Sequence, residues 1–146
     1  MTFVYATCIA LRERGAWRGV LLRGPSGAGK SDLALRLIDA GGRLVSDDQT
    51  HLAASRSKLV GSAPQKLAGL IEARGVGIVW LPRRQLLTKA AIALAIDLVA
   101  PDKVERLPDP ARETILGISV PVLALTPFEA SAPLKLRLAL TQIVKA

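Results

Sequence analysis

The 146-residue sequence contains very few cysteine, histidine and aromatic residues. One cysteine and one histidine exclude an internal disulfide and a zinc site built from these two residue types. Two Phe, two Trp and one Tyr are too few for a platform on which single-stranded nucleic acid would stack, so we expect no nucleic-acid partner. The core must be aliphatic, and cytoplasmic residence is the default expectation.

The sequence also lacks a long uncharged apolar run. A bilayer span needs roughly 20 such residues. The longest run, 90–96, meets Asp97 before it continues to Ala100, so we expect no membrane span. Residues 1–11 show neither the basic start nor the small-residue cleavage site of a secretory leader, and we expect them to belong to the fold.

The residues that are abundant describe a folded, basic protein. Half of the chain is apolar and 22% is charged, which allows a real core, and 146 residues fit a single domain spanning 1–146. The 20 Lys and Arg exceed the 12 Asp and Glu, so the net charge is +8. The basic residues are scattered, and this surface favours anionic ligands or an acidic protein partner.

Apolar spacing predicts an α/β fold with a mixed sheet, a β-hairpin and flanking helices. Short apolar runs predict strands over 19–23, 43–45, 78–81, 91–99 and 120–125, and a hairpin from 52–54 and 59–61. A helix is expected over 32–40, stopped by Gly41 and Gly42. A helical pattern after Pro64 would bury Leu67, Leu70 and Ile71, and a last helix over 132–145 would bury Leu134, Leu138 and Val144.

A complete phosphate-binding motif, G-x-x-x-x-G-K-S, lies between the first of these strands and the first helix. Its residues are Gly24, Pro25, Ser26, Gly27, Ala28, Gly29, Lys30 and Ser31. Glycines let the backbone curl so that its N–H groups point inward, and the helix adds its positive N-terminal end. Lys30 would reach the outer phosphates and the Ser31 hydroxyl would bind Mg²⁺. The sequence therefore predicts a nucleotide or polyphosphate site.

Two adjacent carboxylates follow the next strand. Asp47 and Asp48 come at its carboxyl end, where open α/β sheets bind their ligands. Near a metal-bound triphosphate, one carboxylate can support the metal while the other accepts the proton of an attacking hydroxyl. This pair indicates phosphoryl transfer to a hydroxyl group.

Four segments in this order resemble the HPr serine kinase/phosphorylase family, specifically its catalytic domain without the N-terminal domain of longer members. They are G-P-S-G-A-G-K-S-D-L-A-L-R-L-I at 24–38, G-R-L-V-S-D-D at 42–48, G-S-A-P at 61–64 and I-E-A-R-G-V-G-I at 71–78. The resemblance implies a P-loop kinase-like domain that transfers phosphate from ATP, with Mg²⁺, to a serine of the phosphocarrier protein HPr. It also implies removal of that phosphate with inorganic phosphate, and a homo-oligomer, commonly a hexamer.

The same resemblance implies individual residue roles. Lys30 and its loop would hold ATP, while Ser31 and Glu72 would support Mg²⁺. Asp48 would accept the proton of the HPr serine, and donate one in the reverse direction, with help from Asp47.

Two arginines complete the implied catalytic set. Arg74, within I-E-A-R-G-V-G-I, is expected to take part in both reactions. Arg106, in V-E-R-L, matches the arginine of the family's F-D-R-L and would neutralise charge on the transferring phosphoryl group.

The sequence departs from the family at two places, which leaves two other functions open. Tyr5 stands where the family has a histidine, and L-T-P-F-E-A at 125–130 replaces a P-V-x-P-G-R segment linked to phosphorylase action. A nucleotide- or phosphate-sensing module without catalysis is therefore one alternative. A P-loop kinase of a small metabolite is the other, favoured by the short chain.

Overall fold

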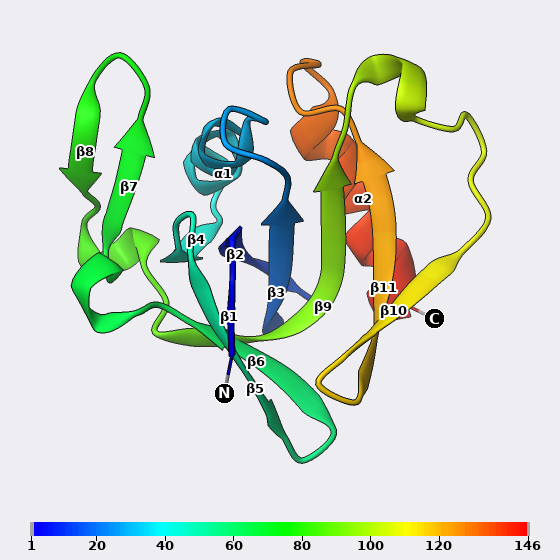
Figure 1. Cartoon of the computed structure of the whole chain (residues 1–146), viewed down its shortest axis with the longest axis horizontal. Coiled ribbons are helices and arrows are strands. Elements are labelled where there is room, and N and C mark those ends of the chain that lie inside the picture. The colour runs from blue at the N-terminus through cyan, green and yellow to red at the C-terminus, as the bar shows by residue number, and fades with distance from the viewer. Residues whose placement is uncertain (1, 146) are drawn as a thin grey trace.

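The computed structural model describes residues 2–145 as an α/β protein (Figure 1). The strands are β1 (Thr2–Val4), β2 (Ala6–Glu13), β3 (Ala16–Arg23), β4 (Arg43–Ser46), β5 (Thr50–Ser55), β6 (Lys58–Ser62), β7 (Leu70–Ala73), β8 (Gly77–Trp80), β9 (Lys89–Leu98), β10 (Ala111–Ile115) and β11 (Ile118–Leu125). The helices are α1 (Lys30–Asp39) and α2 (Ala132–Lys145), with short 3₁₀ helices η1 (Gln65–Leu67), η2 (Arg83–Gln85) and η3 (Pro101–Lys103).

A curled mixed sheet forms the centre of the molecule, and its path runs β1-β5-β6-β9-β3-β2-β4. β11 joins this sheet beside β9 and carries β10 on its other side. β7 and β8 form a separate hairpin that stands beside α1 (Figure 1). The fold class predicted from the sequence, a mixed sheet with a hairpin and flanking helices, is confirmed.

Four strands end at the same edge of the sheet. β9 pairs in parallel with β3 and with β11, and β4 has the same direction because β3 and β4 both pair antiparallel with β2. Open α/β sheets bind ligands at the carboxyl ends of such strands. The segments 24–29, 47–49 and 126–131 follow three of these ends, so strand direction alone brings them to one side of the protein.

The central strands are buried on both faces. Val20 and Leu22 of β3 pack in a core with the two helices, whereas Leu21 faces a second core beneath the β5–β6 hairpin. This arrangement explains why the strand predicted over 19–23 is a continuous apolar run rather than an alternating one. Cys8 lies in the second core, where burial raises the pKa of its thiol to about 12 and keeps it protonated.

The helix predicted after Pro64 is wrong. The segment forms only η1, and Leu70 and Ile71 belong to β7, where they pair with Trp80 and Val79 of β8. Gly69 has a φ of +83°, a conformation that ends any helix at this point. The spacing of the leucines reflected two separate short elements.

The predicted final helix is confirmed, and Val144 packs partly buried against the core, but the other two positions predicted to be buried are wrong. α2 buries Ala132, Leu136 and Leu140, whereas Leu134 and Leu138 are exposed. Leucine occupies every second position from 134 to 140, so apolar residues occur on both faces and periodicity could not choose between them. Packing against the sheet therefore determines which face of α2 is buried.

Besides β7, the sequence analysis did not predict three further strands, β1, β2 and β10. β2 is the most buried of them, and it lies between β3 and β4. The remaining strand predictions and the hairpin of β5 and β6 are confirmed, with ends shifted by one to three residues. In the part of the chain that the structure describes, no helix is long and apolar enough to cross a membrane.

A matched pair of substitutions on α2 tests which face is buried. Leu136→Ala should lower the free energy of unfolding by about 2–5 kcal/mol, because it leaves a cavity among packed side chains. Leu138→Ala, two residues away and exposed, should change it by less than about 0.5 kcal/mol. Urea unfolding followed by circular dichroism measures both, and equal losses would contradict this assignment of faces.

Candidate active site

The phosphate-binding motif forms a loop that joins β3 to α1 at the carboxyl edge of the sheet. Gly27 and Gly29 have φ values of +83° and +95°, which residues other than glycine rarely adopt. Gly29 is the N-cap of α1, and no side chain caps this end of the helix. The first N–H groups of α1 therefore point toward the loop, and no capping side chain accepts hydrogen bonds from them. Such N–H groups can bind an anion.

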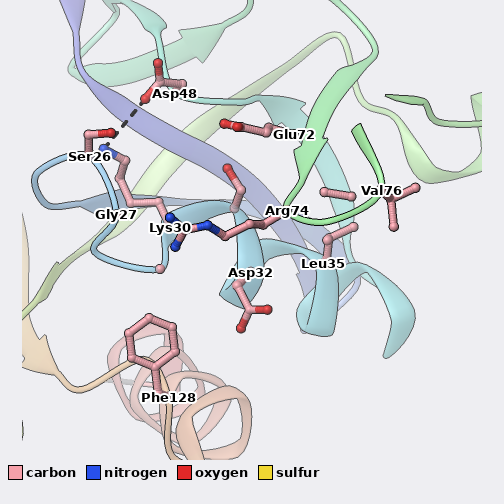
Figure 2. Close-up of a pocket in the computed structure, with 13 residues that line it drawn as sticks. Ser26, Gly27, Lys30, Asp32, Leu35, Asp48, Glu72, Arg74, Val76 and Phe128 are labelled. Carbon is pink, nitrogen blue, oxygen red and sulfur yellow. Dashed lines mark ion pairs between the residues drawn. The ribbon is translucent and has the colours of Figure 1, made fainter. Parts of the chain in front are cut away.

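Lys30 is held inside this loop. Its side chain is almost fully buried, and Nζ donates a 2.6 Å hydrogen bond to the Gly24 carbonyl oxygen. Nζ also lies 3.7 Å from Oδ1 of Asp48 (Figure 2). The ammonium group is thus fixed between the start of the loop and the acidic pair, where it would meet the outer phosphate of a bound chain.

The two adjacent aspartates have different surroundings. Asp47 is buried at 7% exposure, and its Oδ1 accepts hydrogen bonds from the Thr7 hydroxyl at 2.9 Å and the Ser31 hydroxyl at 2.7 Å. Its Oδ2 accepts one from the Glu72 N–H at 3.0 Å. One carboxylate therefore ties together β2, α1 and β7.

Asp48 instead faces the pocket. Its φ of +64° turns the chain, and its N–H donates to the Thr7 hydroxyl oxygen at 3.1 Å. The side chain is 63% exposed and points toward Lys30 (Figure 2). Aspartate tolerates the left-handed conformation better than most residues, so the turn separates two neighbouring carboxylates into a buried one and an exposed one.

A pocket of about 510 Å³ opens above the loop. Lys30, Ser31 and Asp48 line it from the sheet edge, and the β7–β8 hairpin contributes Glu72 and Arg74 (Figure 2). The other lining residues are Ser26, Gly27, Gly29, Asp32, Leu35, Ala73, Val76 and Phe128. Hydroxyl and carboxylate oxygens are the ligands that Mg²⁺ prefers, so the oxygens of Ser31 and Glu72 fit that ion.

The structure does not bring every predicted site residue to this pocket. Asp47 is buried and does not line the pocket, and its hydrogen bonds hold Thr7, Ser31 and the backbone of Glu72 in place. Arg106 lies in the exposed segment between η3 and β10, outside the residues that line the pocket. Tyr5, at the position of the family histidine, is 76% exposed between β1 and β2 and does not line the pocket.

The sequence analysis missed two residues that shape the site. Thr7 forms hydrogen bonds with both aspartates, and the only indication in the sequence is that it is a polar residue within the apolar run 6–11. Phe128 lines the pocket, and its signal was an aromatic residue directly after the last predicted strand in a chain with only two Phe. Neither signal indicates a role without the tertiary contacts.

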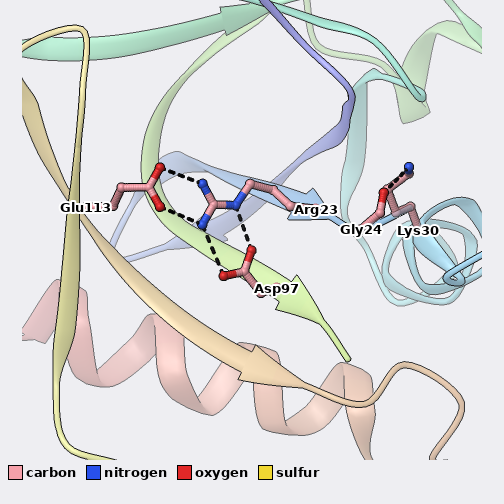
Figure 3. Close-up of polar contacts among 5 residues, drawn as sticks. All are labelled: Arg23, Gly24, Lys30, Asp97 and Glu113. Carbon is pink, nitrogen blue, oxygen red and sulfur yellow. Dashed lines mark hydrogen bonds and ion pairs between the residues drawn. The ribbon is translucent and has the colours of Figure 1, made fainter. Parts of the chain in front are cut away.

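An ionic network secures the strand that leads into the loop (Figure 3). Arg23, one residue before Gly24, binds Asp97 of β9 at 2.8 Å and Glu113 of β10 at 2.9 Å. The hydrogen bond from Arg23 lowers the pKa of Glu113, and the bond to Glu113 together with Asp97 raises the pKa of Arg23. This arginine links three strands at the entrance to the loop.

The fold and the site together define an α/β protein with an acidic pair beside a glycine-rich loop at the N-terminus of a helix. A family model described as "HPr Serine kinase C-terminal domain" matches residues 15–133. The chain belongs to this HPr serine kinase C-terminal domain family.

Relatives and a solved structure agree with this assignment. The chain is 47% identical over 64 residues to the HPr kinase/phosphorylase of Clostridium tetani, and 38% identical over 112 residues to that of Bordetella pertussis. These matches cover 44% and 70% of this chain but only 21% and 36% of the relatives. The structure of the Hpr(Ser) kinase/phosphatase from Coxiella burnetii has a TM-score of 0.79 at 30% identity, covering 99% of this chain and 95% of that one.

A pair of isosteric substitutions separates the two aspartates. Asp47→Asn replaces one accepting oxygen by a donating NH₂ among buried donors, and should cost about 1.5–3 kcal/mol of stability. Asp48→Asn keeps the left-handed turn and a solvated side chain, so its cost should be below about 0.5 kcal/mol. Thermal unfolding measures both variants, and a larger loss at position 48 would refute this division.

The Arg23 network should make stability depend on pH. The pKa of Glu113 is lower in the folded state than its ordinary value of 4.5, so its contribution is complete above that value and is lost as the pH falls through the folded-state pKa. The difference in Tm between the protein and Glu113→Gln should be largest near neutral pH and should shrink as the pH falls below 4.5 and Glu113 becomes protonated in the folded protein. It should also shrink in about 1 M salt, because Glu113 is half exposed.

Proposed function

We propose that this chain is an ATP- and Mg²⁺-dependent serine protein kinase whose acceptor is the phosphocarrier protein HPr. The observation that carries the proposal is the position of Asp48, which faces the pocket 3.7 Å from the Lys30 ammonium group of the phosphate-binding loop. The printed names of the relatives, HPr kinase/phosphorylase, support the choice of acceptor.

The loop would bind the phosphates of ATP through residues 24–31. Its curled backbone and the N-terminal N–H groups of α1 offer donors to phosphate oxygens. Ser31 and Glu72 would hold Mg²⁺, which would neutralise phosphate charge when bound. Ser31 uses its hydroxyl proton in the hydrogen bond to Asp47, so the lone pairs of the hydroxyl oxygen stay available to bind a metal ion.

Asp48 would act as the general base. It would take the proton of the HPr serine hydroxyl while the seryl oxygen forms a bond to the γ-phosphorus and the bond to the leaving ADP oxygen breaks. Lys30 and Arg74 would stabilise the negative charge on the transferring group. Asp47 would assist by holding Ser31 and the Glu72 backbone in place, as its three hydrogen bonds indicate.

The reverse reaction would use the same groups. Inorganic phosphate would attack phosphoserine, pyrophosphate would form, and protonated Asp48 would return the proton to the seryl oxygen. The role of Arg106 stays a prediction, because this arginine lies outside the pocket. A single domain over 1–146, a homo-oligomer such as a hexamer, and a cytoplasmic location also stay predictions.

The second candidate is a nucleotide-sensing module without catalysis. The observation that favours it is Tyr5, which replaces the family histidine and lies in solvent. A phenol, whose ordinary pKa is about 10, does not titrate near neutrality as a histidine does. If Tyr5→His produced phosphoserine where the unchanged protein did not, this candidate would be preferred.

A transfer assay with HPr, ATP and Mg²⁺, followed by detection of phosphoserine, tests the proposal. Asp48→Asn should lower kcat by about 10²–10⁴-fold and leave ATP affinity within about threefold. Lys30→Ala should weaken ATP binding by at least about tenfold, because it removes a charge-assisted contact to phosphate. Isothermal titration calorimetry measures the affinities.

Two outcomes would contradict the proposal. ATP binding by the unchanged protein without any phosphoserine on HPr would leave only a nucleotide-binding module. Equal loss of ATP affinity in the two variants would place Asp48 in binding rather than in proton transfer. Leu138→Ala is the matched control, because this exposed residue of α2 does not line the pocket.

A further inference from the structure

One aromatic side chain in the pocket has no role in the phosphotransfer chemistry. Phe128 follows β11 at the carboxyl edge of the sheet, lines the pocket and is 69% exposed. Figure 2 shows Asp48 and Phe128 on opposite sides of the phosphate-binding loop. Because the ring lines a pocket, its exposed face is available to an apolar or aromatic part of a ligand bound there.

The backbone around this ring is fixed to α1. Arg36 donates one hydrogen bond to the Pro127 carbonyl oxygen and another, at 3.2 Å, to the Glu129 carbonyl oxygen. The guanidinium group therefore binds the backbone carbonyl oxygens of the residues on both sides of Phe128. A 2.9 Å ion pair with Asp32, one turn earlier on α1, holds Arg36 in turn. The ring is consequently presented at a defined place although it is exposed.

The ring also touches the phosphate-binding loop. A Cβ atom built on Gly29 would lie 2.9 Å from Cζ of Phe128, so the ring edge lies where a side chain at position 29 would begin. Gly29 is the last loop residue before α1, at the end of the loop that would hold the phosphates. A group attached to those phosphates, on the side away from Asp48, would meet the ring.

We propose that Phe128 is the stacking platform for the nucleobase of the bound nucleotide. This inference rests on the proposed function, in which the terminal phosphate faces Asp48 and Lys30. With that end fixed, the nucleoside leaves the loop on the opposite side, where Phe128 lies (Figure 2). The pocket volume of about 510 Å³ is within the range of nucleotide-sized ligand sites.

Stacking also defines the class of ligand. A ring face recognises the π-face that every nucleobase has, and it does not read the hydrogen-bonding edge. The site should therefore take nucleoside triphosphates with little discrimination between their bases. An inorganic polyphosphate would use the loop and Lys30 but would gain nothing from Phe128.

Calorimetry with ATP and with inorganic tripolyphosphate, both with Mg²⁺, tests the inference. Phe128→Ala should weaken ATP binding by about 5- to 30-fold and change tripolyphosphate binding by less than about twofold. Phe128→Leu, which keeps apolar bulk but removes the π-face, should lose an intermediate amount. The variants should fold, because the side chain is exposed.

Val76→Ala and Leu138→Ala are the matched comparisons. Val76 is an exposed apolar residue that lines the same pocket from the hairpin, and Leu138 is an exposed one outside it. A selective loss of ATP affinity in Val76→Ala but not in Phe128→Ala would overturn the inference, because the base would then lie under the hairpin. Equal weakening of ATP and tripolyphosphate in Phe128→Ala would overturn it too, since the ring would then act only by shaping Gly29.

The two proposals fail in different ways. If the unchanged protein bound neither ATP nor tripolyphosphate, the phosphate site itself would be refuted, and the stacking platform with it. If it bound both with equal affinity and Phe128→Ala changed neither, the phosphate site would stand and only the platform would fall. A Phe128→Trp variant gives a second readout: relative to the unchanged protein, ATP should quench the added fluorescence and tripolyphosphate should not.

Discussion

The site depends on one buried carboxylate. Asp47 accepts hydrogen bonds from Thr7 of β2, Ser31 of α1 and the backbone of Glu72 in β7. A buried charge is tolerated only when donors surround it, and here the donors come from three elements that are far apart in the sequence. Satisfying this carboxylate therefore sets the positions of the sheet, the phosphate-binding loop and the hairpin relative to one another.

The division between the aspartates follows from that constraint. Because Asp47 is committed to structure, the left-handed turn at Asp48 directs the second carboxylate toward Lys30. Arg36 serves the other end of the pocket in the same manner, since it attaches the segment after β11 to α1. The pocket is thus built from loops at one sheet edge, each secured by polar contacts to a neighbouring element.

Much of the fold could be predicted from residue patterns, for identifiable reasons. The run at 19–23 and the turn residues at 56 and 57 act locally, so the strand and the hairpin they predict are confirmed. The helix predicted after Pro64 failed because pairing with β8 decided the conformation of Leu70 and Ile71. The prediction of the buried face of α2 failed because leucines lie on both faces of this helix, so packing against the sheet determines which face is buried.

Residue patterns alone predict the glycine-rich loop before α1, since Gly27, Gly29, Lys30 and Ser31 lie within one short segment whose backbone geometry is local. They also predict that two carboxylates follow the next strand. Long-range packing, by contrast, sets which carboxylate is buried, the support of both by Thr7, and the contact of Phe128 with Gly29. These contacts join residues about 40 to 100 positions apart, and their geometry depends on strand order and direction, which no local pattern encodes.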